Sequence, residues 1–175
     1  MSSTNTIPIE NIFVTVGSTR FDQLIDNVID DNVVEILKHL GCRRLTIQYG
    51  SYKDVSKLES VQNVISHFEV ELFDYQNSIQ SYIDKADLVI GHAGAGTVLE
   101  VLRKRKPLLI VINDTLMDNH QEELAIELAE QRFVRCCYPS TLKETLKSFN
   151  LKSLIPFPEH DSIRFRSFIE SVFQQ

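Results

Sequence analysis

The stretch from Asp87 to Lys104 reads DLVIGHAGAGTVLEVLRK and decides the class of fold. Residues 87–90 are a short run typical of a buried strand. The glycine-rich residues 91–96 follow, and helical spacing of apolar residues begins near Ala95 or Thr97 and continues to Lys104. A buried strand that enters a helix through a glycine-rich turn is one unit of an α/β fold.

The same unit recurs along the chain. Strands are predicted at residues 11–16, 45–49, 70–73, 87–90, 108–112 and 133–136, and helices at 21–40, 55–64, 79–85, 97–104 and around 124–129. This alternation predicts right-handed βαβ crossovers, and therefore a Rossmann-like parallel sheet with helices on both faces. Ligands of such sheets bind at the carboxyl ends of the strands.

Composition excludes several classes of protein. The chain has 175 residues, of which 43% are apolar and 24% charged, as expected for one globular domain. Its longest apolar run, Leu108–Ile112, is far shorter than the ~20 residues of a membrane span. Three cysteines make a poor disulfide framework, and a net charge of -6 disfavours nucleic acid as a partner. The start has no signal-peptide pattern, so we expect a cytoplasmic protein.

Gly94 and Gly96 are the most informative residues for chemistry. Without a Cβ they let a ligand approach the backbone, and the helix that begins beside them offers unpaired N–H groups to a diphosphate. The spacing is neither the dinucleotide-binding GxGxxG after a first strand nor a Walker A motif. A nicotinamide cofactor and a P-loop hydrolase are therefore disfavoured, while a phosphate site and a plain tight turn both remain open.

Polar side chains stand at the same predicted edge in three further places. They are Ser18 and Thr19 after the first strand, Glu100 one turn past Gly96, and Asp118, Asn119, His120 and Gln121 after the fifth strand. Such groups can bind phosphate, a ribose diol and sugar hydroxyls, respectively. They also serve as turn residues, as acids that complement a helix dipole and as helix caps, so both interpretations stay open.

Two histidines, His92 and His120, lie at strand ends. A single histidine is more often structural than catalytic, but two at one edge of the sheet raise the odds of a proton-transfer or phosphate-contact role. No metal-ligand spacing joins them, so we expect no metal. The basic run Arg103–Lys106 closes a helix, where cations offset the negative end of the dipole; contact with an anionic membrane surface is the alternative.

The residues after Pro156-Phe157-Pro158 form a separate segment, which divides the chain into a domain at 1–158 and a C-terminal helix at 159–175. Its apolar residues follow helical spacing: Phe165, Phe168, Ile169, Val172 and Phe173. This amphipathic helix either packs on its own sheet or docks on a partner.

Three stretches, Asp87–Glu100, Lys106-Pro107-Leu108 and Asn113–Gln121, together resemble the C-terminal half of GT-B glycosyltransferases of family 28, which are related to the bacterial peptidoglycan N-acetylglucosaminyltransferase. Within that family the chain is similar to the small cytosolic catalytic subunits of the eukaryotic UDP-N-acetylglucosamine transferase of dolichol-linked oligosaccharide synthesis. The resemblance runs from about Ile12 through Cys136 and extends toward the tail.

This resemblance implies roles for individual residues. UDP diphosphate would meet residues 94–97 and Ser18, Glu100 would bind the ribose, His120 and Gln121 the sugar, and Phe73 and Asp74 would lie near uracil. With the residue analysis, it leads us to expect catalytic roles for His92, Glu100 and His120. Substrate binding is expected from Ser18, Thr19, Phe73, Gly94, Ala95, Gly96, Thr97, Glu100, Asn119, His120 and Gln121.

The chain has length for only one of the two halves of a GT-B enzyme. The resemblance therefore implies a membrane-anchored partner at the cytosolic face of the endoplasmic reticulum, which supplies the acceptor-binding half and the lipid-linked acceptor. The implied reaction is transfer of N-acetylglucosamine from UDP-N-acetylglucosamine to N-acetylglucosaminyl-diphosphodolichol, β1,4 and inverting, without a cofactor. The rival interpretations are a non-catalytic nucleotide-sugar-binding or scaffold protein and a free-standing flavodoxin-like module.

Overall fold

The computed structural model describes residues 8–65, 67–114 and 119–158, and only the backbone of residues 61, 63, 64, 119 and 120. Its strands are β1 (Asn11–Thr15), β2 (Arg44–Gln48), β3 (Glu69–Phe73), β4 (Leu88–His92), β5 (Leu108–Val111) and β6 (Arg135–Cys137). Its α-helices are α1 (Asp22–Val28), α2 (Asp31–His39), α3 (Val55–Val64), α4 (Gln80–Lys85), α5 (Ala95–Arg103), α6 (Asn119–Glu130) and α7 (Leu142–Lys147). Two 3₁₀ turns, η1 (Pro139–Thr141) and η2 (Leu151–Ser153), flank α7.

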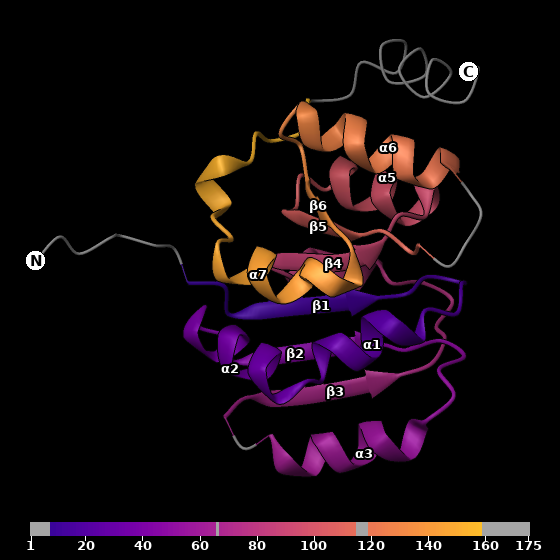
Figure 1. The fold of residues 1–175 in the computed structure, drawn as a ribbon, viewed down its shortest axis with the longest axis vertical. Coiled ribbons are helices and arrows are strands. Elements are labelled where there is room, and N and C mark those ends of the chain that lie inside the picture. The colour runs from indigo at the N-terminus through magenta and orange to yellow at the C-terminus, as the bar shows by residue number, and fades with distance from the viewer. Residues whose placement is uncertain (1–7, 66, 115–118, 159–175) are drawn as a thin grey trace, which may run out of the picture.

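The strands form one parallel sheet in the order β3-β2-β1-β4-β5-β6, so the predicted Rossmann-like fold is confirmed. In Figure 1 they follow one another upward from β3, with their carboxyl ends at the right. The chain adds strands on one side of β1 first and then returns to the other side with β4. The loops after β1 and β4 therefore leave toward opposite faces and open a crevice between them.

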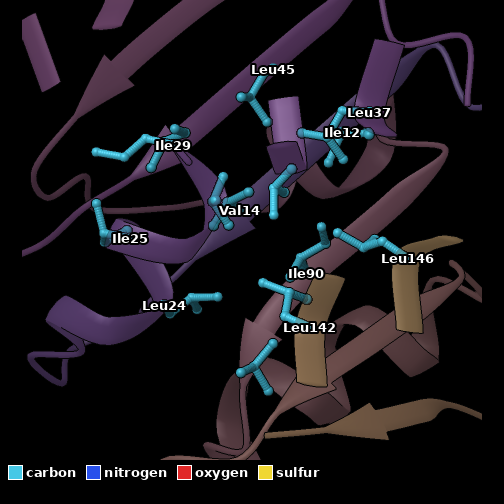
Figure 2. Packing of buried hydrophobic residues seen from close by; sticks show 14 of the residues in the cluster. Ile12, Val14, Leu24, Ile25, Ile29, Leu37, Leu45, Ile90, Leu142 and Leu146 are labelled. Carbon is cyan, nitrogen blue, oxygen red and sulfur yellow. The ribbon is translucent and has the colours of Figure 1, made fainter. Parts of the chain in front are cut away.

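Two apolar layers hold the helices on the sheet. Helices α1, α2, α3 and α7 bury Leu24, Leu37, Leu58 and Leu142 against one face, and α4, α5 and α6 bury Ile83, Val98, Leu102 and Leu124 on the other. Figure 2 shows Leu142 and Leu146 of α7 in the same cluster as Ile12, Val14 and Ile90 of the central strands. Among the described residues, no helix is long and apolar enough to span a membrane.

Three elements differ from the prediction. The single helix expected at 21–40 is two helices, because Asp30 adopts an extended conformation and its carboxylate accepts the Asn32 N–H, which caps a new helix. Strand β4 continues through Gly91 to His92, where a linker was expected. Helix α7 was not predicted; its six residues give little periodic signal, and burial of Leu142 and Leu146 stabilises it.

The basic run at the end of α5 is tied to α4. The Lys104 ammonium lies 2.9 Å from an Asp84 carboxylate oxygen, and Lys106 Nζ donates to the carbonyls of Asp84 and Ala86 at 2.7 and 3.0 Å. These carbonyls are at the end of α4, where backbone acceptors lack intrahelical partners. These two lysines thus contact α4, whereas the sequence predicted a role at the end of their own helix; that role and the alternative of membrane contact stay predictions.

Asp87 joins the two central strands at their amino ends. Its Oδ2 accepts the backbone N–H groups of Glu10 and Asn11 at 3.0 and 2.8 Å, and the Asn11 side-chain amide at 3.2 Å. Its own N–H donates to the Asn11 carbonyl at 2.8 Å. One carboxylate thus sets where β1 begins relative to β4.

We expect Asp87→Ala to lower the free energy of unfolding by about 1–3 kcal/mol, because the N–H groups of Glu10 and Asn11 lose their acceptor. Asp87→Asn keeps an acceptor oxygen and is expected to lose less. Urea denaturation followed by circular dichroism measures both variants. Equal midpoints for Asp87→Ala and the wild type would contradict this role.

Candidate functional site

Two glycine-bearing turns meet where β1 and β4 end side by side. Thr15, the last residue of β1, pairs with Gly91 of β4, so the β1 loop and the turn into α5 begin next to each other. The loop after β5 starts on the other side of β4. Residues 115–118 of that loop, with the predicted Asp118, lie outside the described residues.

His92 fills the space between the two turns. It is 5% exposed, and its Nε2 lies 3.4 Å from Thr19 Oγ1. A Cβ at Gly17 would lie 2.5 Å from its Cε1, and a Cβ at Gly94 would lie 2.2 Å from its Nε2. Gly17 also has a φ of +61°, which disfavours other residues. The ring and the two glycines are therefore one packed unit.

The imidazole of His92 carries an unsatisfied polar atom. Its Nδ1 is buried and has no hydrogen-bond partner among the described residues. Burial also lowers the pKa of His92, so the ring is neutral near pH 7. A buried nitrogen without a partner is costly. An unpaired buried group of this kind marks the place as a candidate functional site.

The amino end of α5 presents backbone donors to the same place. Gly94 is its N-cap and supplies no side-chain acceptor, and the first hydrogen bond in the helix runs from Val98 N–H to the Gly94 carbonyl at 3.0 Å. The N–H groups of residues 95–97 precede that bond and have no intrahelical acceptor. Together with the dipole of α5, they form a site for an anion.

Gly96 and Thr97 complete this end of the helix. Gly96 is exposed, and a Cβ there would meet nothing within 4 Å, so the fold itself does not require glycine at this position. Thr97 Oγ1 lies 3.4 Å from the position of a Cβ on Gly17. The predicted Gly94, Ala95, Gly96, Thr97 and Thr19 are thus gathered around His92, with Ser18 exposed beside Gly17.

Glu100 and Gln121 lie farther from this centre along their helices. Glu100 is half-buried, one turn past Gly96 on α5, and no hydrogen bond joins its side chain to another described residue. Gln121 is half-buried in the first turn of α6. Asn119 and His120 begin α6, and their side chains lie outside the described part of the chain. The roles expected of these four residues stay predictions.

Phe73 is engaged in an aromatic cluster. Its ring stacks on Tyr82 with centroids 4.6 Å apart, and on Phe13 at 6.3 Å. Its expected place near uracil stays a prediction. The next aromatic residue, Tyr75, was not singled out from the sequence, although it follows β3 at the carboxyl edge and is 49% exposed.

Two buried polar residues were also missed. Thr15 and Gln48 end β1 and β2, and their exposed fractions are 0% and 4%. The signal was available, because each is a polar residue near the carboxyl end of a predicted strand, where ligands of such sheets bind. Their contacts with the β1 loop are described below.

Other candidate features fall outside this site. A hollow of about 660 Å³ lies against α4 and the sheet, lined by residues such as Asn11, Arg44 and Lys85, and no predicted site residue lines it. No cluster of three or more metal-ligating side chains occurs in the described ranges. The tail residues Phe165, Phe168, Ile169, Val172 and Phe173 lie beyond those ranges.

Sequence comparison identifies relatives over most of the chain. A UDP-N-acetylglucosamine transferase subunit ALG13 of Saccharomyces cerevisiae is 33% identical over 193 residues, covering 93% of this chain and 96% of that protein. The mouse protein of the same name is 42% identical over 125 residues, or 71% of this chain. This chain spans only 10% of the mouse protein and 11% of its human counterpart.

Solved structures of related proteins have the same fold as this chain. An NMR solution structure of ALG13 superposes with a TM-score of 0.73 at 30% identity, covering 95% of this chain and 98% of that one. Acinetobacter baumannii MurG shares the fold, with a TM-score of 0.62 at 23% identity, over 81% of this chain and 40% of that one. The family model described as glycosyltransferase family 28 C-terminal domain matches residues 11–172. With its parallel sheet and its glycine-flanked histidine, the chain therefore belongs to the glycosyltransferase family 28 C-terminal domain family.

Proposed function

We propose that this chain is the catalytic, donor-binding subunit of a heteromeric glycosyltransferase. Its donor is UDP-N-acetylglucosamine, and its acceptor is N-acetylglucosaminyl-diphosphodolichol at the cytosolic face of the endoplasmic reticulum. The observation that carries the proposal is the orphaned Nδ1 of His92 beside the uncapped amino end of α5. The names of the relatives support the choice of donor.

The diphosphate of the donor binds at the amino end of α5, beside the two turns that pack on His92. The N–H groups at the start of α5 and the hydroxyls of Ser18, Thr19 and Thr97 surround this position. Those donors and the positive end of the α5 dipole stabilise a bound anion. Binding therefore needs neither a metal nor another cofactor. His92 packs against both turns and so shapes the phosphate-binding loops.

The rest of the donor extends along α5 and α6. Glu100 accepts hydrogen bonds from the ribose diol, since its carboxylate is half-buried and faces no described partner. Asn119, His120 and Gln121 bind the sugar from the amino end of α6, and Phe73 lies near the uracil. The aromatic cluster of Phe73, Tyr82 and Phe13 supports that part of the edge.

The reaction is a single inverting displacement. The 4-hydroxyl oxygen of the acceptor forms a bond to the anomeric carbon, the bond from that carbon to the UDP oxygen breaks, and UDP leaves with the electron pair. The hydroxyl proton passes to a base. Donors at the start of α5 stabilise the charge that develops on the departing diphosphate. His92 lies within the phosphate-binding turns, so its catalytic role is to stabilise the leaving group.

The acceptor half comes from a second, membrane-anchored subunit. The match to MurG covers 40% of that chain, which supports the view that this fold is one half of a two-part enzyme. The relatives are named as subunits. The C-terminal segment, 159–175, is the proposed docking element.

Gly96→Ala separates ligand binding from folding. Since a methyl group there meets no protein atom and alanine favours helix by about 1 kcal/mol, the melting temperature should equal or exceed that of the wild type. UDP affinity should fall about tenfold, because the methyl group stands where the diphosphate approaches. Calorimetric titration of UDP in EDTA measures this.

Gly94→Ala is the matched comparison. Its methyl group collides with His92, so both the melting temperature and UDP affinity should fall. If Gly96→Ala bound UDP as tightly as the wild type, the proposed diphosphate position would be wrong. Dependence of UDP binding on a divalent cation would contradict the metal-free mode.

Transfer of radiolabelled N-acetylglucosamine from UDP to a diphospholipid-linked N-acetylglucosamine is expected only when this chain is mixed with its partner subunit. Glu100→Ala should raise the donor KM about tenfold or abolish transfer, whereas Glu130→Ala, an exposed acid at the end of α6, should not. A complex that binds UDP but transfers nothing would favour the non-catalytic binding protein.

Removal of the residues after Pro158 should abolish co-purification with the partner and leave the domain folded. The shortened chain still contains Phe157, whose ring packs edge-on against Phe133 with centroids 5.0 Å apart. Circular dichroism checks the fold of the shortened chain. In the whole chain, Phe168→Glu tests the apolar face of the predicted C-terminal helix without a truncation. Retained co-purification in both variants would exclude the tail as the docking element.

A further inference from the structure

A hydrogen-bonded ring of Thr15, Gly17 and Gln48 holds the β1 loop. Thr15 and Gln48 are register partners at the ends of β1 and β2. The Gly17 N–H donates to Thr15 Oγ1 at 3.0 Å, the Thr15 hydroxyl donates to Gln48 Oε1, and Gln48 Nε2 donates to the Gly17 carbonyl at 3.4 Å. Both polar groups of the Gly17 backbone are therefore engaged.

The ring admits one arrangement of the Gln48 amide. The Gly17 carbonyl needs a donor, and only the amide nitrogen supplies one. The amide oxygen then faces Thr15, whose hydroxyl hydrogen is available because its oxygen already accepts the Gly17 N–H. Side chains as buried as these are costly to leave unpaired, so the closed ring resists rearrangement.

The ring is connected to the candidate diphosphate site through Gly17. A Cβ on Gly17 would lie 2.5 Å from His92 Cε1 and 3.4 Å from Thr97 Oγ1, so the Gly17 backbone packs directly on both site residues. Thr19, two residues later, lies 3.4 Å from His92 Nε2 through its hydroxyl. A shift of the Gly17 peptide would therefore move the loop that carries Ser18 and Thr19.

We propose that Gln48 and Thr15 are positioning residues, which hold the β1 loop in its diphosphate-binding conformation before the ligand arrives. This inference rests on the proposed function. Neither side chain touches the ligand in this arrangement; both act through Gly17. The advantage is preorganisation, because a loop that is already ordered does not lose conformational freedom on binding.

The test compares UDP affinity and loop protection in whole-chain variants. Gln48→Met keeps the size of the side chain and removes both of its hydrogen bonds, and Thr15→Val removes the hydroxyl. Each should weaken UDP binding about tenfold by calorimetry. Each should also speed amide hydrogen exchange at Gly17 in the ligand-free chain about tenfold, as followed by NMR.

Two controls separate positioning from general stability. Thr15→Ser keeps the hydroxyl and should retain wild-type affinity. Thr46→Val changes a hydroxyl that is 5% exposed, on the same face of β2 and two residues before Gln48, and should leave UDP affinity unchanged even if the melting temperature falls. All variants are compared at a temperature where circular dichroism shows them folded. The double variant should lose no more affinity than either single one.

Wild-type affinity in Gln48→Met, or an equal loss in Thr46→Val, would overturn the proposal. A wild-type chain that binds no UDP would count against the proposed function instead. In that case hydrogen exchange alone tests whether Gln48 and Thr15 hold the β1 loop. Faster exchange at Gly17 in Gln48→Met would support the proposal, and unchanged exchange would overturn it.

Discussion

The pairing of β1 with β4 is the constraint on which the rest of the structure depends. It places β2 and β3 on one side of β1, and β4, β5 and β6 on the other. Helices α1, α2 and α3 pack on one face of the sheet and α4, α5 and α6 on the opposite face, while α7 returns to the first face. Asp87 secures this pair at the amino ends, while Gly17 and Gly94 let the two turns approach His92 at the carboxyl ends. Fold and candidate site thus share one pair of strands.

The site that results is polar and only partly satisfied. Around it the buried side chains that the structure describes pair their polar groups, as in the ring of Thr15, Gly17 and Gln48, whereas His92 Nδ1 has no partner and the first N–H groups of α5 have no intrahelical acceptor. An interior that leaves donors unpaired at one place gives up stability there. This concentration of unmet hydrogen bonds is the physical reason to assign a ligand to this edge.

The chain matches one half of a two-part fold, and this match explains several of its features together. The hollow of about 660 Å³ lies away from the candidate site, and the match to MurG covers less than half of that protein. Backbone donors suffice for a diphosphate, but they cannot enclose a sugar or orient an acceptor. The proposed function assigns those roles to a second subunit, and the relatives are named as subunits.

The sequence by itself determined the parallel α/β fold and placed Gly94, Gly96 and the residues around them at one edge, because alternating apolar runs and glycine positions are local signals. Only the tertiary structure revealed the burial of His92 between Gly17 and Gly94, the helix α7, and the ring through Gln48. The ring joins residues 31 and 33 positions apart, His92 meets Thr19 across 73 positions, and α7 depends on packing; spacing along the chain carries no record of such contacts. Periodicity reports which face of an element is buried, and the partner across that face is decided only when the chain is folded.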